Sequence, residues 1–124
     1  ESIVQELLSE FNLSHLRNVI ANNLSGGERK KLVIARALVN NPKILLMDEP
    51  SVGLSPLIVD EIFAIIKQLN EDGMSILLVE QNATKALQVA DYFYLLDQGK
   101  VTFSGTPDQL KDDDIIKRAY LGGS

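Results

Sequence analysis

The feature that most constrains the fold is a short apolar run that ends in two adjacent carboxylates. Residues 44–47 read Ile-Leu-Leu-Met, and Asp48, Glu49 and Pro50 follow directly. An apolar run too short for a helix and bounded by Pro42 and Pro50 favours a central strand of a parallel sheet, covered on both faces. Ligands of open α/β sheets bind beyond the carboxyl ends of such strands. The pattern therefore predicts an α/β fold with a functional edge at the two acids.

The two carboxylates need not share one task. Successive residues of a strand point to opposite sides, so one of Asp48 and Glu49 can hold a metal ion while the other handles a proton. The alternative is a strand that simply ends in a polar loop, and the octapeptide alone does not decide between the two interpretations.

A second strand pattern follows one helix later. Residues 56–71 carry isoleucines at core spacing behind Pro56, with Asp60 and Glu61 expected in the favoured acidic first turn. Residues 74–79 form another apolar run, which ends in Glu-Gln-Asn and leads into a helix over 83–90. The strand–helix–strand–helix order predicts a parallel sheet with right-handed crossovers. Gln81 would then lie at the same sheet edge as Asp48.

A glycine-rich helix start precedes the first strand. Ser25 and Glu28 have the spacing of a capping box, which alone indicates only that a helix begins there. Gly26 and Gly27 are poor helix formers, but they allow a ligand to approach the backbone closely. Because a helix N-terminus carries free N–H groups and partial positive charge, the segment is a candidate phosphate site.

The two ends of the chain predict simpler elements. Residues 2–11 have the apolar spacing of an amphipathic helix, and a short helix capped by Ser14 follows. Residues 92–96 and 100–103 predict two strands joined by a tight turn, and further helices are expected from Thr106 and over 114–121. The chain opens with Glu1 inside a predicted helix, so we expect it to be a fragment.

Composition excludes several classes of function. The chain has 124 residues, enough for one domain, with a formal net charge of −5 and no cysteine. Nucleic-acid binding as the main role is disfavoured because it needs clustered basic residues, and the one cluster, residues 29–31, is interpreted as a solvated helix face. Disulfides and thiolate metal sites are excluded. His15, the only histidine, has no second ligand or nucleophile nearby and receives no role.

Three elements in order carry a resemblance to a known family: Leu-Ser-Gly-Gly-Glu at 24–28, Ile-Leu-Leu-Met-Asp-Glu-Pro at 44–50, and the strand-end Gln81. Together they resemble the C-terminal part of the nucleotide-binding domain of ABC ATPases. The resemblance covers essentially residues 1–124 and implies a partial domain, with a helical signature segment at 1–40 and the remainder of the catalytic core at 41–124. No Gly-x-x-x-x-Gly-Lys-Ser/Thr motif occurs in the chain, so the phosphate-loop half is expected upstream.

The resemblance implies ATP and Mg²⁺ as cofactors and assigns roles by position. Asp48 would support Mg²⁺ through water, and Glu49 would be the general base for the attacking water. Leu24, Ser25, Gly26, Gly27 and Glu28 would form the signature segment, of which the serine and the glycines touch the γ-phosphate of ATP held by a second ATPase subunit.

Two further positions complete the implied site. Gly53 would belong to a loop across the dimer interface, and Gln81 would sense the γ-phosphate. Many family members have His where this chain has Gln81, and Asp where it has Ser55. Glutamine can hydrogen-bond a phosphate or a water but cannot carry a proton or positive charge.

The function implied is the ATP-binding and ATP-hydrolysing subunit of an ABC transporter. Its partners would be a second ATPase subunit and transmembrane permease subunits, with no nucleic acid, on the cytoplasmic face of the cell membrane. Residues 49–56 and 77–83 are most similar to importers of branched-chain amino acids, whereas Ser-Gly-Gly-Glu-Arg-Lys-Lys is similar to lipopolysaccharide-export ATPases.

Two alternatives remain open. One is a non-hydrolysing half-domain that complements a complete ATPase in trans; the other is a soluble ABC-type ATPase of translation or DNA repair. Without the phosphate loop, the fragment alone is expected to be inactive.

Overall fold

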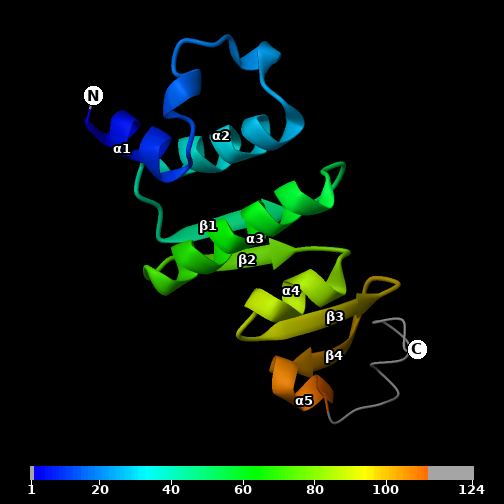
Figure 1. The fold of residues 1–124 in the computed structure, drawn as a ribbon. Coiled ribbons are helices and arrows are strands. Elements are labelled where there is room, and N and C mark those ends of the chain that lie inside the picture. The colour runs from blue at the N-terminus through cyan, green and yellow to red at the C-terminus, as the bar shows by residue number, and fades with distance from the viewer. Residues whose placement is uncertain (1, 112–124) are drawn as a thin grey trace. The chain divides into compact units, whose positions relative to one another are not determined.

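The computed structural model describes residues 2–111, which fall into two compact units divided between Val79 and Glu80 (Figure 1). The first unit begins with helix α1 and two single-turn 3₁₀ helices and continues with an α/β arrangement. Its elements are α1 (Ser2–Glu10), η1 (Ser14–Leu16), η2 (Ala21–Asn23), α2 (Gly26–Leu38), β1 (Ile44–Asp48), α3 (Pro56–Glu71) and β2 (Ser75–Val79). The predicted α/β fold with parallel strands and flanking helices is therefore confirmed.

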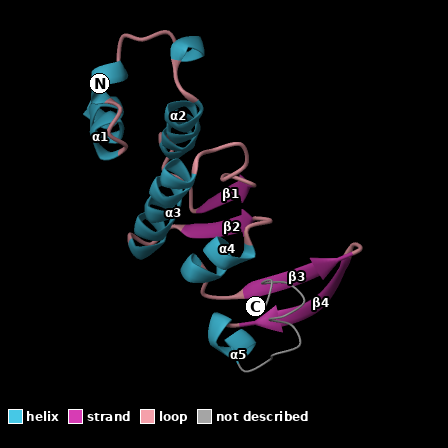
Figure 2. Cartoon of the chain, turned by 45° about the vertical axis from the view of Figure 1, so that its right-hand side comes forward, coloured by secondary structure: helices cyan, strands magenta, loops and turns pink. Residues whose placement is uncertain are grey.

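Strands β1 and β2 pair in parallel, with Ile44 opposite Ser75 and Asp48 opposite Val79. Helix α3 makes the crossover between them and lies against one face of the pair, as both ribbon views show (Figure 2). It buries a stripe at helical spacing, namely Val59, Ile62, Phe63, Ile66 and Leu69. These side chains belong to the core of the first unit together with Leu45 and Met47 of β1. The other buried apolar residues of this unit are Phe11, Leu13, Leu24, Ile34 and Ala35.

The expectation that the first strand is covered on both faces is wrong for the residues described. Leu45 and Met47 are buried, whereas Ile44 and Leu46 on the opposite face are 61% and 71% exposed. Helix α3 covers only the side to which Leu45 and Met47 point, and sequence alternation cannot show this because both sets of side chains are apolar.

Helix boundaries correct two smaller predictions. Helix α3 begins at Pro56, so its first turn contains no acid, and Asp60 and Glu61 lie one turn further on. Ser14 is the first residue of η1 and not its N-cap, which is Leu13. The amphipathic stripe of α1 becomes more buried along the helix: Ile3 and Val4 are about half exposed and Leu7 and Leu8 are half-buried. Phe11 and Leu13, which follow the helix, are both 3% exposed.

The second unit contains the predicted strand pair. Its described elements are α4 (Ala83–Val89), β3 (Phe93–Asp97), β4 (Lys100–Gly105) and α5 (Pro107–Lys111). Strands β3 and β4 are antiparallel. Gln98 and Gly99 join them with φ angles of 48° and 75°, the pair of positive values that a tight hairpin turn requires. The helix predicted over 114–121 lies outside the described residues.

Within residues 2–111, none of the helices combines the length and apolar character needed to cross a bilayer.

Candidate functional site

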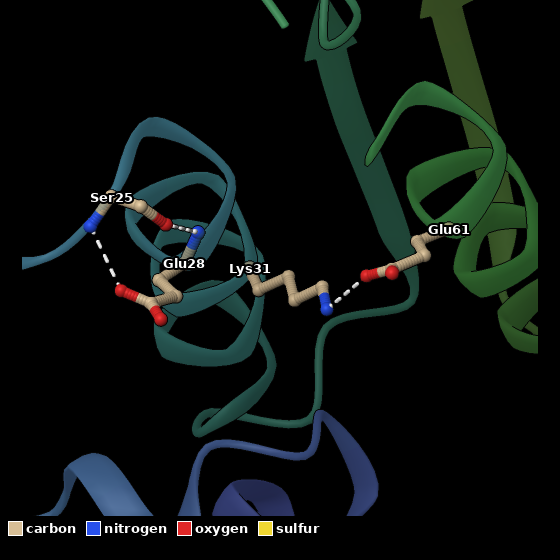
Figure 3. A network of polar contacts seen from close by, with 4 residues as sticks. All are labelled: Ser25, Glu28, Lys31 and Glu61. Carbon is tan, nitrogen blue, oxygen red and sulfur yellow. Dashed lines mark hydrogen bonds and ion pairs between the residues drawn. The ribbon is translucent and has the colours of Figure 1, made fainter. Parts of the chain in front are cut away.

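The N-terminus of α2 is built as the capping box predicted. Ser25 N donates to Glu28 Oε2 at 2.8 Å, and Glu28 N donates to Ser25 Oγ at 3.2 Å, as Figure 3 shows. Ser25 itself is extended, with φ −61° and ψ 163°, so the chain enters the helix abruptly. Gly26 and Gly27 are the first two helical residues, whose N–H groups have no acceptor within a helix. The segment can therefore present a hydroxyl and two amides to an anion.

Gly27, but not Gly26, is also needed for the close approach of α2 to the start of α3. A Cβ added at Gly27 would lie 2.7 Å from Ile58 Cγ2, closer than real side chains approach each other. A Cβ at Gly26 would lie 3.6 Å from Leu54 Cδ2, which is an ordinary contact. The signature segment thus touches the loop that follows the strand-end carboxylates.

Two basic residues of α2 make contacts within the protein that the sequence did not predict. Arg29 Nη2 donates to the carbonyl oxygens of Leu24 and Asn22 at 3.3 and 3.4 Å, which ties the guanidinium to the segment before the helix. Lys31 forms an ion pair with Glu61 of α3, and its side chain is only 15% exposed. The interpretation of residues 29–31 as a solvated face is wrong for Lys31, whereas Arg29 remains exposed as predicted. Spacing could not reveal the ion pair because its members lie 30 positions apart.

The two predicted carboxylates lie at the carboxyl end of β1. Asp48 is exposed and is the last residue of the strand, opposite Val79 of β2. Glu49 is half-buried and has φ of 45°, a left-handed conformation that is uncommon for residues other than glycine. Its N–H donates to Val79 O at 2.8 Å, so the sheet holds the backbone in place immediately before the chain turns.

The described residues contain no cluster of three or more His, Asp or Glu side chains that could enclose a metal ion. Mg²⁺ does not require such a cluster, because it keeps several waters and is often bound through one or two carboxylates plus substrate phosphates. An exposed Asp48 at a strand end fits such a site, and the remaining ligands would come from water and nucleotide.

Gly53 lies in the loop between β1 and α3. Its φ of 74° is a left-handed conformation that favours glycine. Space is not the reason, because a Cβ there would meet nothing within 4 Å. Leu54 N donates to Ser51 O at 3.3 Å within the same loop, and Val52 N donates to Glu49 O at 3.2 Å. The loop therefore connects Glu49 to Leu54, the residue that a Cβ at position 26 would contact.

Gln81 belongs to the second unit. It is exposed, and its carbonyl oxygen accepts a hydrogen bond from Ala83 N at 2.9 Å. The next residue, Asn82, caps α4 by accepting from Lys85 N at 3.2 Å. Asn82 was not recognised from the sequence, although Asn is a preferred N-cap residue. The cap and the turn hold Gln81 at the entry to α4.

The amino-acid sequence is similar to those of ATP-binding proteins of ABC transporters. The sequence profile of the ABC transporter family matches residues 1–52. The lipopolysaccharide export system ATP-binding protein LptB of Haemophilus influenzae is 44% identical over 117 residues, which is 94% of this chain and 48% of that protein. The high-affinity branched-chain amino acid transport ATP-binding protein BraG of Pseudomonas aeruginosa is 48% identical over 103 residues, 83% of this chain and 44% of that protein.

A solved structure agrees in fold. The ADP conformation of MJ1267, an ATP-binding cassette of an ABC transporter, superposes with a TM-score of 0.82 at 31% identity, covering 99% of this chain and 51% of that one. The chain spans about half the length of the curated relatives that it matches. Because a lipopolysaccharide export protein and a branched-chain amino acid transport protein match about equally well, the predicted branched-chain amino-acid importer subgroup is not confirmed.

Proposed function

We propose that this chain belongs to the ATP-binding proteins of ABC transporters and supplies the signature segment and the catalytic carboxylate of an ATPase that energises transport. ATP with Mg²⁺ would be the substrate. A second ATPase subunit would complete the site, and transmembrane permease subunits would anchor the pair at the cytoplasmic face of the membrane. Residues 1–124 would form one partial ATPase domain, with a helical signature segment at 1–40 and the remainder of the catalytic core at 41–124.

The N-terminus of α2 carries most of the support. The Ser25 hydroxyl accepts the Glu28 N–H, so it keeps its own proton for an oxygen acceptor such as a phosphate. The N–H groups of Gly26 and Gly27 follow directly at the positive end of the helix dipole. We therefore assign the γ-phosphate contact to these three residues, within a signature segment that runs from Leu24 to Glu28.

The end of β1 would supply the hydrolytic chemistry. Glu49 is assigned as the general base that orients the attacking water, since the sheet fixes its backbone at the strand end. Asp48 is assigned to Mg²⁺ through a water molecule, where the ion offsets phosphate charge. Gln81 is assigned as the residue that senses the γ-phosphate, and Gly53 as part of the loop that meets the second subunit.

For the transported substrate we propose branched-chain or other hydrophobic amino acids, following the 48% identity to BraG. Lipopolysaccharide export is the second candidate, because the match to LptB extends over more of the chain, 117 residues against 103. Reconstituting the complete protein with each class of permease, and measuring which one stimulates ATP hydrolysis, decides between them.

The assignment of Glu49 is tested in the complete protein, meaning this chain with whatever its gene encodes on either side. Glu49→Gln preserves size and hydrogen bonding but removes the base, so we expect turnover to fall by at least about a hundredfold. ATP binding should persist, and the variant should accumulate as an ATP-bound dimer. Phosphate release and equilibrium nucleotide binding are the two measurements.

Glu71→Gln is the matched control, because Glu71 is exposed near the end of α3 and its ion pair with Lys67 is long, at 3.9 Å. We expect this control to keep wild-type turnover. Wild-type phosphate release by Glu49→Gln would refute Glu49 as the base.

A further inference from the structure

The proposed phosphate contacts all lie on the first turn of α2, so their direction depends on how that helix is fixed to its neighbour. Two contacts between α2 and α3 are one turn apart on both helices. Gly27 meets Ile58, and Lys31, four residues further along α2, pairs with Glu61, three residues further along α3. Residues three or four apart share a helix face, so the two contacts lie on facing sides of the same pair of helices.

Each contact restricts a different movement. Because Gly27 has no Cβ, Ile58 of α3 occupies the space that a side chain would need. This packing limits how closely α2 can approach α3 and how far α2 can rotate about its axis. The Lys31–Glu61 ion pair, seen in Figure 3 to reach from α2 to α3, opposes sliding of one helix along the other. A shift of one residue would move α2 by about 1.5 Å, enough to separate the charged atoms.

We propose that Lys31 and Glu61 are positioning residues that set the direction of Ser25 and the first amides of α2 towards the γ-phosphate. The inference rests on the proposed function, since it concerns the same site. In the proposed function, neither Lys31 nor Glu61 touches the nucleotide. The inference adds that their ion pair nevertheless affects the rate of ATP hydrolysis. A misplacement on the order of 1 Å in a site of this kind costs up to about a hundredfold in rate.

The burial of the two side chains predicts an asymmetry. Lys31 is 15% exposed, whereas Glu61 is 42% exposed. Removing Glu61 leaves a largely buried ammonium without its carboxylate, while removing Lys31 leaves a carboxylate that water can solvate. Glu61→Gln is therefore the more harmful change, although both remove the same ion pair.

The test is steady-state ATP hydrolysis by the complete protein with Lys31→Met, Glu61→Gln, Lys31→Arg and the exchanged pair Lys31→Glu/Glu61→Lys. For the two single changes we expect kcat to fall about tenfold, with Glu61→Gln lower, and KM for ATP to stay within about twofold. Lys31→Arg and the exchanged pair should recover at least half of the wild-type kcat. Lys67→Met and Glu71→Gln, which remove the long exposed ion pair on α3, should change nothing.

A purely structural role is distinguished by a double-mutant cycle with Ser25. If Lys31 acts by directing the first turn of α2, Lys31→Met should cause a smaller fold loss in a Ser25→Ala background than in the wild type, because part of the contact that it directs is already absent. Fully multiplicative losses would overturn the proposal. Circular dichroism and gel filtration show whether each variant folds. If Glu61→Gln does not fold, the exchanged pair provides the test. An exchanged pair that folds but has a kcat as low as that of Lys31→Met would also overturn the proposal.

The same assay separates this inference from the proposed function. Wild-type rates for both Ser25→Ala and Glu49→Gln would refute the proposed function itself. Defects in those two variants together with wild-type rates for the Lys31 and Glu61 variants would refute the positioning role alone.

Discussion

At the scale of single residues, Glu49 combines a proposed chemical role with a conformational cost. Its φ of 45° places a glutamate where glycine would be easier to accommodate, and Val79 O holds its N–H at 2.8 Å. Left-handed residues other than glycine cost about 1 kcal/mol or more and persist where the surroundings determine them. Strained residues are common in functional sites, and the proposed role of the Glu49 carboxylate as general base would account for a glutamate in place of glycine.

Glu49→Gly should separate the two roles. Glycine adopts the left-handed conformation without strain, so we expect the free energy of unfolding to stay the same or to rise by up to about 1 kcal/mol. ATP hydrolysis by the complete protein should be lost, because the base is gone. Urea unfolding and phosphate release are the measurements, and a clear loss of stability would show that the Glu49 side chain is needed for folding.

Gly27 is a second residue whose identity follows from geometry. Gly27→Ala should lower the free energy of unfolding by about 1–3 kcal/mol, because its Cβ would lie 2.7 Å from Ile58 Cγ2 and overpack the helix contact. Alanine's better helix propensity, about 1 kcal/mol, works in the opposite direction and does not overcome the clash.

Gly26→Ala is the matched control for this prediction, since its Cβ would meet only Leu54 Cδ2 at 3.6 Å. We expect it to be neutral or slightly stabilising in the same urea unfolding experiment. The combination Gly27→Ala/Ile58→Ala should be less destabilised than the sum of its two single changes, and additive losses would show that the clash is not the cause.

At the scale of elements, α2 shows how one N-terminus can serve stability and binding together. The capping box that starts the helix uses the Ser25 oxygen as an acceptor, while the proposed phosphate contact uses the same hydroxyl as a donor. Ser25→Asp should separate these roles. Aspartate caps as well as serine, so we expect stability within about 0.5 kcal/mol of wild type, whereas Ser25→Ala should lose about 1 kcal/mol.

Hydrolysis should respond differently to the same changes. Aspartate places a negative charge where the γ-phosphate is proposed to lie, so turnover of Ser25→Asp should fall at least about tenfold and further than that of Ser25→Ala. Thermal unfolding and phosphate release, measured on the same samples, check the two halves of the prediction. Turnover of Ser25→Asp equal to wild type would remove Ser25 from the phosphate site.

The elements also show what the sequence could and could not predict. The capping box, the strand run and the paired left-handed residues at Gln98 and Gly99 are local, because each depends on residues within a few positions. The Lys31–Glu61 ion pair and the Gly27–Ile58 approach join residues about 30 apart, so only the packed structure reveals them. Likewise the exposed side of β1 depends on where α3 packs and not on the strand's own apolar pattern.

At the scale of the whole molecule, the parallel strands leave one apolar face in solvent within the first unit. Its exposed side chains are 53–71% accessible and lie on the same side of the pair: Ile44, Leu46, Leu77 and Val79. Parallel sheets are normally covered on both faces, and exposed apolar patches promote association. A polypeptide limited to residues 1–124 should therefore self-associate.

Sedimentation velocity over a range of concentrations measures this directly. Leu46→Lys places a charge in the middle of the exposed face and should shift the 1–124 polypeptide towards monomer. Ile20→Lys changes a side chain that is equally exposed, at 70%, but lies at the entry to η2, away from the strands, and should leave association unchanged. Equal effects of the two changes would assign the association to general hydrophobicity. A larger effect of Leu46→Lys would locate the association on the exposed face of the sheet. That face would then be the surface that another segment or chain covers.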